Sequence, residues 1–230
     1  MDQILHPVQL RSARRGAGLT QQRAADRLGV SQAYLALIEG GRRPVTAQLR
    51  SKIVDLYGLG PVSLPLDAEN LGGWDSSSLA AGLASLGYPG FRQLKGSLLN
   101  PATLLLAAVA ASNVEVRVLE ALPWLAAEYS NLDWEWLIRE AKLRDAQNRL
   151  GFLVTLAQKV AEKRSDSLAA RRLQETVETL DRARLAREDT LCQASLSEAE
   201  RRCLRRTRPI EARHWNLLTD LKSQLLPYAA

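Results

Sequence analysis

The sequence contains few residues of the types that usually carry catalysis, metal binding or disulfide bonds. Its 230 residues include two cysteines, two histidines and one methionine, and aromatic residues make up 5% of the chain. Two cysteines cannot form the disulfide framework of a small secreted protein, so we expect the protein to act in a reducing cytoplasm. The first residues also lack the charged, then apolar, then small-residue order of a signal peptide.

Long apolar runs are also lacking. The longest, residues 98–111, contains Pro101 and is too short to span a bilayer, so we expect a buried helix there and no membrane association. The net charge of +6 is unevenly spread, with +5 in residues 1–60, −3 in residues 61–150 and +4 in residues 151–230. Two basic ends are compatible with a polyanionic partner.

No pattern of residues indicates catalysis or a metal site. Glycine loops for phosphate and the G-x-S-x-G motif are missing. Cys192, Cys203 and His214 recur at intervals of eleven residues, which fits no common zinc motif and leaves a fourth ligand to be found. Asp133 and Glu135 lie at an expected helix start, where acidic residues favour the helix dipole. We therefore expect no enzymatic activity, no cofactor and no bound metal.

Nearly the whole chain has the periodicity of α-helices, so we expect an all-α protein. Residues 1–60 are expected to form a DNA-binding domain, residues 61–78 a linker, residues 79–164 a larger helical domain for partner binding or dimerisation, and residues 165–230 an amphipathic helical extension. Pro123 is expected to kink or end the helix that begins near Val114. Gly151 interrupts an apolar stripe, where it is expected to allow close packing.

Residues 20–44 have the pattern of two short helices joined by a tight turn. Thr20 and Ser31 are suitable N-caps for helices over residues 21–28 and 32–39, and Gly29 suits the left-handed position between them. Apolar residues in both helices allow them to cross over a shared core. The apolar positions before and after them, which begin at Val8, predict flanking helices and a five-helix bundle.

Residues 7–59 resemble the helix-turn-helix domain of the Xre/Cro family of phage-repressor-like regulators. The matching residues are Leu19-Thr20-Gln21, Ala25, Leu28-Gly29-Val30-Ser31-Gln32, Ile38-Glu39-Gly40, Arg42-Arg43-Pro44 and Leu56. The resemblance implies that the helix over residues 32–39 lies in the major groove of double-stranded DNA. Because one such module makes few contacts, we expect a homodimer on two half-sites.

Nine residues are candidates for DNA contact, and most lie at the starts of these two helices or in the basic loop after them. They are Gln21, Arg23, Ser31, Gln32, Ala33, Tyr34, Leu37, Arg42 and Arg43. Gln32 is expected to bond an adenine edge, and Ala33 and Leu37 are expected to touch thymine methyl groups.

The remaining polar candidates are expected to position the domain on phosphates. Relatives often carry an acidic residue where this chain has Arg23, and a basic residue where it has Leu37. Arg23 is therefore interpreted as an added phosphate contact, and polar readout depends mostly on Gln32, which predicts modest sequence discrimination. The preceding basic residues, Arg11, Arg14 and Arg15, are interpreted as a solvated face, with DNA contact as the alternative.

The run Arg149-Leu150-Gly151-Phe152-Leu153 is similar to the arginine–leucine–glycine–aromatic–leucine run of AbiEi-type antitoxins, which pair with nucleotidyltransferase toxins. This resemblance implies an antitoxin that represses its own operon and neutralises a toxin, possibly nucleotidyltransferase-like, through its C-terminal helical region. Close packing around Gly151 is the other explanation of the run. The alternative function is a ligand-sensing transcription regulator with residues 79–164 as the sensor, and an enzyme with a DNA-binding head is the third.

The last part of the chain is mostly charged and ends in an apolar cluster. The cluster consists of Trp215, Leu217, Leu218, Leu221 and Leu225, and it is expected to dock on the protein's own domain or on a partner. An arginine cluster precedes it and consists of Arg201, Arg202, Arg205, Arg206 and Arg208. These arginines are interpreted as a contact for an acidic partner or DNA, or as a solvated face.

Overall fold

The computed structural model describes residues 7–69, 71, 73–226 and 228, and it describes residues 7–9, 47, 51 and 225 by their backbone alone. The chain divides into two compact units. The first contains the residues up to Asp67 together with Leu98–Asn100, and the second contains Ala68–Ser97 and the residues from Pro101 onward. No helix in the described part of the chain is long and apolar enough to cross a membrane.

The first unit is a small helical bundle. Its helices are α1 (Pro7–Gly16), α2 (Gln21–Leu28), α3 (Gln32–Glu39), α4 (Ala47–Tyr57) and the short 3-10 helix η1 (Pro61–Ser63). Thr20, Ser31 and Thr46 each cap a helix by accepting a hydrogen bond from a backbone N–H three residues later. Residues 7–60 thus form four α-helices, and the additional 3-10 turn η1 lies just after them, in the expected linker.

Side chains from all four α-helices form the core of this bundle. The buried core residues are Leu10, Ala24, Ala25, Leu28, Leu35, Ile38, Val45, Leu49, Ile53 and Tyr57. The side chains of Val8 and Leu225, which the sequence assigns to apolar clusters, lie outside the part that the structure describes.

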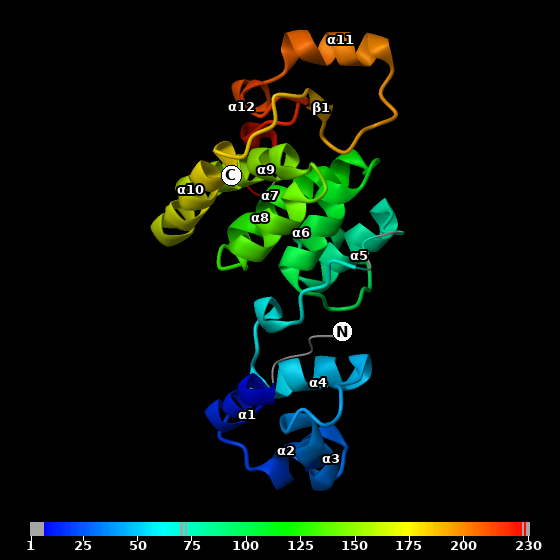
Figure 1. The fold of residues 1–230 in the computed structure, drawn as a ribbon, viewed down its shortest axis with the longest axis vertical. Helices are drawn as coiled ribbons and strands as arrows, with labels where there is room; N and C mark the ends of the chain where they lie inside the picture. The colour runs from blue at the N-terminus through cyan, green and yellow to red at the C-terminus, as the bar shows by residue number, and fades with distance from the viewer. Residues whose placement is uncertain (1–6, 70, 72, 227, 229–230) are drawn as a thin grey trace. The chain divides into compact units, whose positions relative to one another are not determined.

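The second unit is larger and almost entirely helical. Its helices are α5 (Ser76–Ser85), η2 (Pro89–Phe91), α6 (Pro101–Ala110), α7 (Val116–Glu128), α8 (Trp134–Lys142), α9 (Gln147–Lys163), α10 (Ser167–Asp181), α11 (Glu198–Thr207), α12 (Ile210–His214) and η3 (Ser223–Leu225). Nine of the ten residues of α6 are buried, so this helix is the centre of the unit, as its apolar sequence predicts. Helices α7 and α8 pack against α6, and α9 packs against α7 with α10 alongside it (Figure 1).

Two very short strands lie in the C-terminal part of the second unit. β1 (Asp189–Thr190) pairs in parallel with β2 (Leu217–Leu218), and Asn113 forms an isolated antiparallel bridge with Gln193. Val114, which the sequence places inside a helix, precedes α7 and donates its N–H to the Cys192 carbonyl at 2.9 Å. The two strands are 28 residues apart in the sequence, and the contacts of Asn113 and Val114 join segments about 80 residues apart, which local periodicity cannot indicate.

The divisions expected from composition do not coincide with the boundaries between the units. The expected linker over residues 61–78 contains η1 and the start of α5, and the boundary between Asp67 and Ala68 falls inside it. The expected extension belongs to the same unit as residues 101–164. Its helix α10 packs on α9. Leu173 and Leu180 are seven residues apart, so they lie on the same side of α10, and both are completely buried.

The expectation that Pro123 ends its helix is wrong, because α7 continues through Pro123 to Glu128; the alternative expectation, a kink at Pro123, stays a prediction. The Tyr228 hydroxyl enters the helical hydrogen-bond pattern at this point. It donates to the Glu120 carbonyl and accepts a hydrogen bond from the Trp124 backbone N–H at 3.1 Å. Burial raises the pKa of Tyr228 well above its ordinary value, so the hydroxyl keeps the proton that it donates.

Tyr228→Phe should therefore destabilise the second unit. The phenylalanine keeps the ring but leaves two backbone groups of α7 without a partner, which costs about 1–3 kcal/mol for each buried group that water cannot reach. Tyr129→Phe is the matched control, since it removes one hydrogen bond, to the Leu86 carbonyl. Urea unfolding should give a larger loss for Tyr228→Phe, and equal losses would contradict this role of Tyr228.

Candidate nucleic-acid interface

The connection between α2 and α3 is a tight turn that depends on one glycine. Gly29 ends α2 in the left-handed region with φ 72°, which a residue with a Cβ adopts only under strain. The Val30 N–H then bonds back to the Ala25 carbonyl at 3.0 Å. Ser31 starts α3 by accepting a hydrogen bond from the Tyr34 N–H at 3.2 Å. The local sequence thus sets the crossing of the two helices.

Helix α3 buries one side and exposes the other. Leu35, Ile38 and Glu39 are buried. The exposed residues at its N-terminal half are Ser31, Gln32 and Ala33, and Tyr34 and Leu37 are half-buried. The residues expected to read bases therefore occupy the side of α3 that faces away from the core.

Gln32 is held by a neighbouring side chain on α2. Its Nε2 lies 3.5 Å from the Gln21 Oε1, and the Gln21 Nε2 donates in turn to the Glu39 Oε2 at 3.1 Å. Both ends of the Gln21 amide are therefore engaged within the protein. The structure gives Gln21, expected as a phosphate contact, the additional role of positioning Gln32.

A buried ion pair anchors this chain of side chains. The Arg14 guanidinium bonds Glu39 twice, with Nε to Oε1 at 2.6 Å and Nη2 to Oε2 at 3.1 Å, and its Nη1 donates to the Leu19 carbonyl at 2.7 Å. Arg14 is 7% exposed and Glu39 is 2% exposed. The hydrogen bond with Glu39 raises the pKa of Arg14, so the guanidinium keeps its charge.

The interpretation of Arg14 as part of a solvated face is therefore wrong, while Arg11 and Arg15 are exposed. A signal for the ion pair was present in the sequence. Glu39 follows Leu35 by four residues and Ile38 by one, so it lies on the buried stripe of α3, where a carboxylate requires a cationic partner. Nothing in the sequence indicated which arginine supplies the charge.

The basic candidates precede and follow α3 in the sequence, and their side chains are exposed to solvent. Arg23 lies in the first turn of α2, and Arg42 and Arg43 follow α3 in a loop where Gly41 has φ 72°. All three arginines are exposed, and no carboxylate in the described part of the chain forms an ion pair with them. Their guanidinium groups are available to phosphates.

The groups considered for metal or catalytic chemistry lie apart. Burial raises the pKa of the Cys192 thiol to about 11, and its Sγ donates to the Ala108 carbonyl. Cys203 is exposed, and the His214 ring contacts the Asp181 carboxylate at 2.8 Å. Among the described residues, three or more metal-binding side chains do not cluster anywhere. His6 lies outside the described residues.

The run that carries the AbiEi resemblance has packing roles in this structure. The Arg149 Nη1 donates to the last carbonyls of α6, at 3.0 Å to Val109 and 3.1 Å to Ala111, and its Nε bonds Asp189 at 2.8 Å. A Cβ on Gly151 would overlap the indole ring of Trp215. The prediction that Gly151 serves close packing is confirmed.

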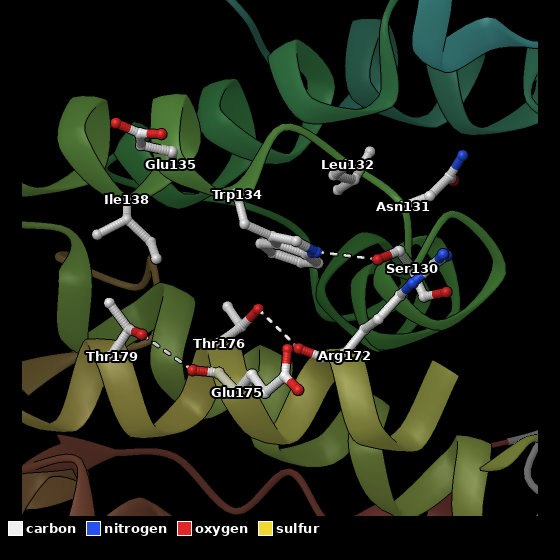
Figure 2. A pocket seen from close by; sticks show the side chains of 10 residues that line it. All are labelled: Ser130, Asn131, Leu132, Trp134, Glu135, Ile138, Arg172, Glu175, Thr176 and Thr179. Atoms are coloured by element: carbon white, nitrogen blue, oxygen red, sulfur yellow. Dashed lines mark hydrogen bonds between the residues drawn. The ribbon is translucent and has the colours of Figure 1, made fainter. Parts of the chain in front are cut away.

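A hollow of ≈ 560 Å³ lies between α8 and α10 in the second unit. Figure 2 shows the Trp134 ring and Ile138 on one side of it and Thr176, Thr179 and Glu175 on the other. The polar groups there bond to nearby backbone: the Trp134 Nε1 donates to the Ser130 carbonyl at 3.0 Å, and both threonine hydroxyls donate to carbonyls of their own helix. These three polar groups are therefore already engaged within the protein, while the charged side chains of Glu135, Arg172 and Glu175 also line the hollow.

Comparison with known proteins supports the geometry of the first unit. Residues 8–65 match a family model described as a helix-turn-helix domain. Searches of curated proteins and of solved structures gave no match. The match covers α2, the turn and α3 together with the helices that flank them. Residues 8–65 are therefore a helix-turn-helix domain, which supports a role for the protein as a DNA-binding transcription regulator.

Proposed function

We propose that the protein is a cytoplasmic, Xre-like repressor that reads its operator with α3 in the major groove. In this proposal Gln32 bonds an adenine edge, and Ala33 and Leu37 contact thymine methyl groups. The phosphate contacts come from the basic and polar residues around α3, namely Arg23, Ser31, Tyr34, Arg42 and Arg43. The protein acts by binding and without catalysis.

The observation that carries this proposal is the support given to Gln32. Gln32 is exposed, yet it is linked through Gln21 to Glu39, which is buried against Arg14. A side chain held in one orientation before binding loses less conformational entropy when it bonds a base. This arrangement favours a base-reading role for Gln32 over a merely solvated one.

Gln32→Ala and Arg42→Ala should weaken operator binding in different ways. Gln32→Ala removes a bidentate base contact and should reduce the discrimination between sequences by about 1–3 kcal/mol. Arg42→Ala removes a phosphate contact and should weaken binding to all sequences about equally, with a salt slope lower by about 1. Fluorescence anisotropy on matched and mismatched duplexes measures both quantities. Equal effects of Gln32→Ala on all duplexes would rule out base reading by Gln32.

We further propose that the protein binds as a homodimer to two half-sites one helical turn apart. One recognition helix supplies few base contacts, and two of them on a palindromic site multiply the affinity. Analytical ultracentrifugation of the complex with a selected duplex should give two protein chains per duplex. One chain per duplex would rule out this part of the proposal.

The finer proposal is that the protein is an antitoxin whose larger helical unit binds a nucleotidyltransferase-like toxin. The AbiEi-like run at residues 149–153 is the support for this proposal. Leu143 and Ile210, which are 73% and 79% exposed, are single apolar side chains that a partner could cover. Co-expression of the full chain with the tagged product of the adjacent gene tests this proposal. A stoichiometric complex that persists with Arg42→Ala supports it, and two separate soluble proteins would contradict it.

The hollow between α8 and α10 favours a second candidate, a regulator that senses a small ligand. The half-buried Trp134 ring forms part of its wall and would provide an apolar surface for such a molecule. A rise in Tm with a small molecule, absent in Trp134→Ala, would support sensing at this site. Unchanged Tm values across a metabolite panel, together with toxin binding, would favour the antitoxin.

A further inference from the structure

Helix α11 differs from the other long helices of its unit because none of its ten residues is buried. It begins with a complete capping box, in which Ser197 and Glu200 each bond the other's backbone N–H. Figure 1 shows it at the edge of the second unit, near β1 and α12. The position of α11 therefore depends on its two ends and on a few polar side-chain contacts with the rest of the unit.

The arginines of α11 and its C-cap fall into two groups. Three of them bond to the protein itself: Arg201 donates to the carbonyls of Ala194 and Leu196, and Arg205 and Arg208 both pair with Glu188. These contacts fix the helix to its own unit.

Arg202 and Arg206 form the second group. Both are exposed, and neither forms an ion pair with a carboxylate in the described part of the chain. The Arg202 Nε donates to the Glu198 carbonyl at 3.3 Å, which leaves the two terminal nitrogens of its guanidinium free of bonds to the described residues. Because they are four residues apart, the two side chains lie on one side of α11.

This pair of arginines adds little to the stability of the fold. Like charges four residues apart disfavour a helix by a few tenths of a kcal/mol, and Glu198, four residues before Arg202, offsets this by a similar amount. The helix dipole favours Arg206 in the last turn, but the same benefit already comes from Arg205. Two adjacent guanidinium groups without an ion-pair partner are suited to bind an external anion that offers two acceptor oxygens, such as a phosphate or a carboxylate.

The surroundings of this pair favour a phosphate backbone over a protein. Stable protein interfaces have an apolar or aromatic centre. The exposed neighbours on α11 itself are Glu198, Ala199, Glu200, Cys203 and Thr207, which offer no large apolar side chain, and the nearest exposed one in the sequence is the single Ile210 on α12. Binding to the DNA backbone is electrostatic and needs no apolar contact, and DNA is the ligand proposed for the helix-turn-helix domain of this chain.

We propose that Arg202 and Arg206 on α11 form a second DNA-binding surface, which contacts backbone phosphates outside the bases that α3 reads. This inference rests on DNA binding by the helix-turn-helix domain. The surface adds affinity and salt dependence without sequence preference, because phosphates carry no sequence information.

The salt dependence of binding tests this surface in the full-length protein. Loss of two phosphate contacts in Arg202→Ala/Arg206→Ala should reduce the slope of log K against log salt by about 1.8 on a duplex with long flanks. Arg202→Lys/Arg206→Lys keeps both charges and should retain the slope. Arg171→Ala/Arg182→Ala removes two exposed charges from α10 and its C-cap, and it should also leave the slope unchanged. Equal slopes for the wild-type protein and the α11 variant would overturn the proposal.

The exposed thiol of Cys203 provides an independent readout. Cys203 lies between Arg202 and Arg206 in the sequence, whereas Cys192 is buried, so a maleimide should label Cys203 alone in the folded protein. A long duplex should slow this labelling, and a duplex trimmed to the operator should slow it less. Labelling that is unaffected by DNA but slowed by a co-purified acidic protein would assign the surface to that protein and overturn the proposal.

The two proposals fail in different ways. If the wild-type protein shows no sequence preference, base reading by α3 fails, but the salt slopes and Cys203 labelling still test α11 on any duplex. If the protein shows a preference and the α11 variant keeps the wild-type slope, the inference about α11 alone fails.

Discussion

Glu39→Ala is expected to unfold the helix-turn-helix domain at room temperature while the second unit stays folded. The substitution leaves the Arg14 guanidinium, which is 7% exposed, without its carboxylate. Removing one partner of a buried ion pair costs about 3–5 kcal/mol. A single core in a domain of this size rarely supplies more than about 3–5 kcal/mol. The expected loss is therefore comparable to the whole stability of the domain.

Calorimetry should show this result as the loss of one of two thermal transitions. Arg14→Met/Glu39→Leu is the matched control, because replacing both charges with apolar side chains of similar size is often neutral or stabilising. This double variant should fold, yet it should bind DNA with less discrimination, since Gln21 loses the Glu39 acceptor that fixes it. A folded Glu39→Ala domain with an unchanged transition would contradict the structural role of the pair.

Trp215→Ala should produce the second large effect, a loss of about 3–5 kcal/mol in the free energy of unfolding of the second unit. The Trp215 side chain is completely buried over Gly151, and its Nε1 donates to the Thr155 Oγ1 at 2.9 Å. The substitution leaves a large cavity between α9 and α12 and removes the hydrogen bond.

Gly151→Ala tests the same contact, because its effect on the free energy of unfolding should have opposite signs in the wild-type and Trp215→Ala backgrounds. In the wild-type protein the added methyl overlaps the indole ring and should destabilise the unit, because overpacking costs about 1–3 kcal/mol. In the Trp215→Ala background the methyl has room, and alanine favours the helix over glycine by about 1 kcal/mol. Urea unfolding of the four variants measures the coupling. Stabilisation by Gly151→Ala in the wild-type background would contradict the contact.

Local patterns predicted the recognition module well because its geometry depends on neighbours in the chain. Thr20, Gly29 and Ser31 act on backbone groups within five residues, so their residue types alone indicated the turn. The ion pair between Arg14 and Glu39 was missed because it joins positions 25 residues apart, and three arginines of α1 were equally available. The position of Gln32 on α3 could be predicted from the sequence, but its support by Gln21 could not.

The second unit was less predictable because distant segments complete its elements. Pro123 has the local properties of a helix breaker, and the hydroxyl that allows α7 to continue comes from Tyr228, more than 100 residues later. The charges of residues 165–181 predicted an amphipathic extension, and α9 supplies the surface on which Leu173 and Leu180 of α10 are completely buried. Sequence reading detects such features but cannot locate the distant partner.

The central claim is that α3 reads DNA sequence through Gln32. The most direct measurement is selection from a pool of random duplexes by the full-length protein and by Gln32→Ala, followed by sequencing of the bound pools. The wild-type protein should enrich a short motif with an adenine at a fixed position, and Gln32→Ala should lose the preference at that position while it still binds DNA. Enrichment of the same motif by both proteins, or of none by the wild-type protein, would contradict this account.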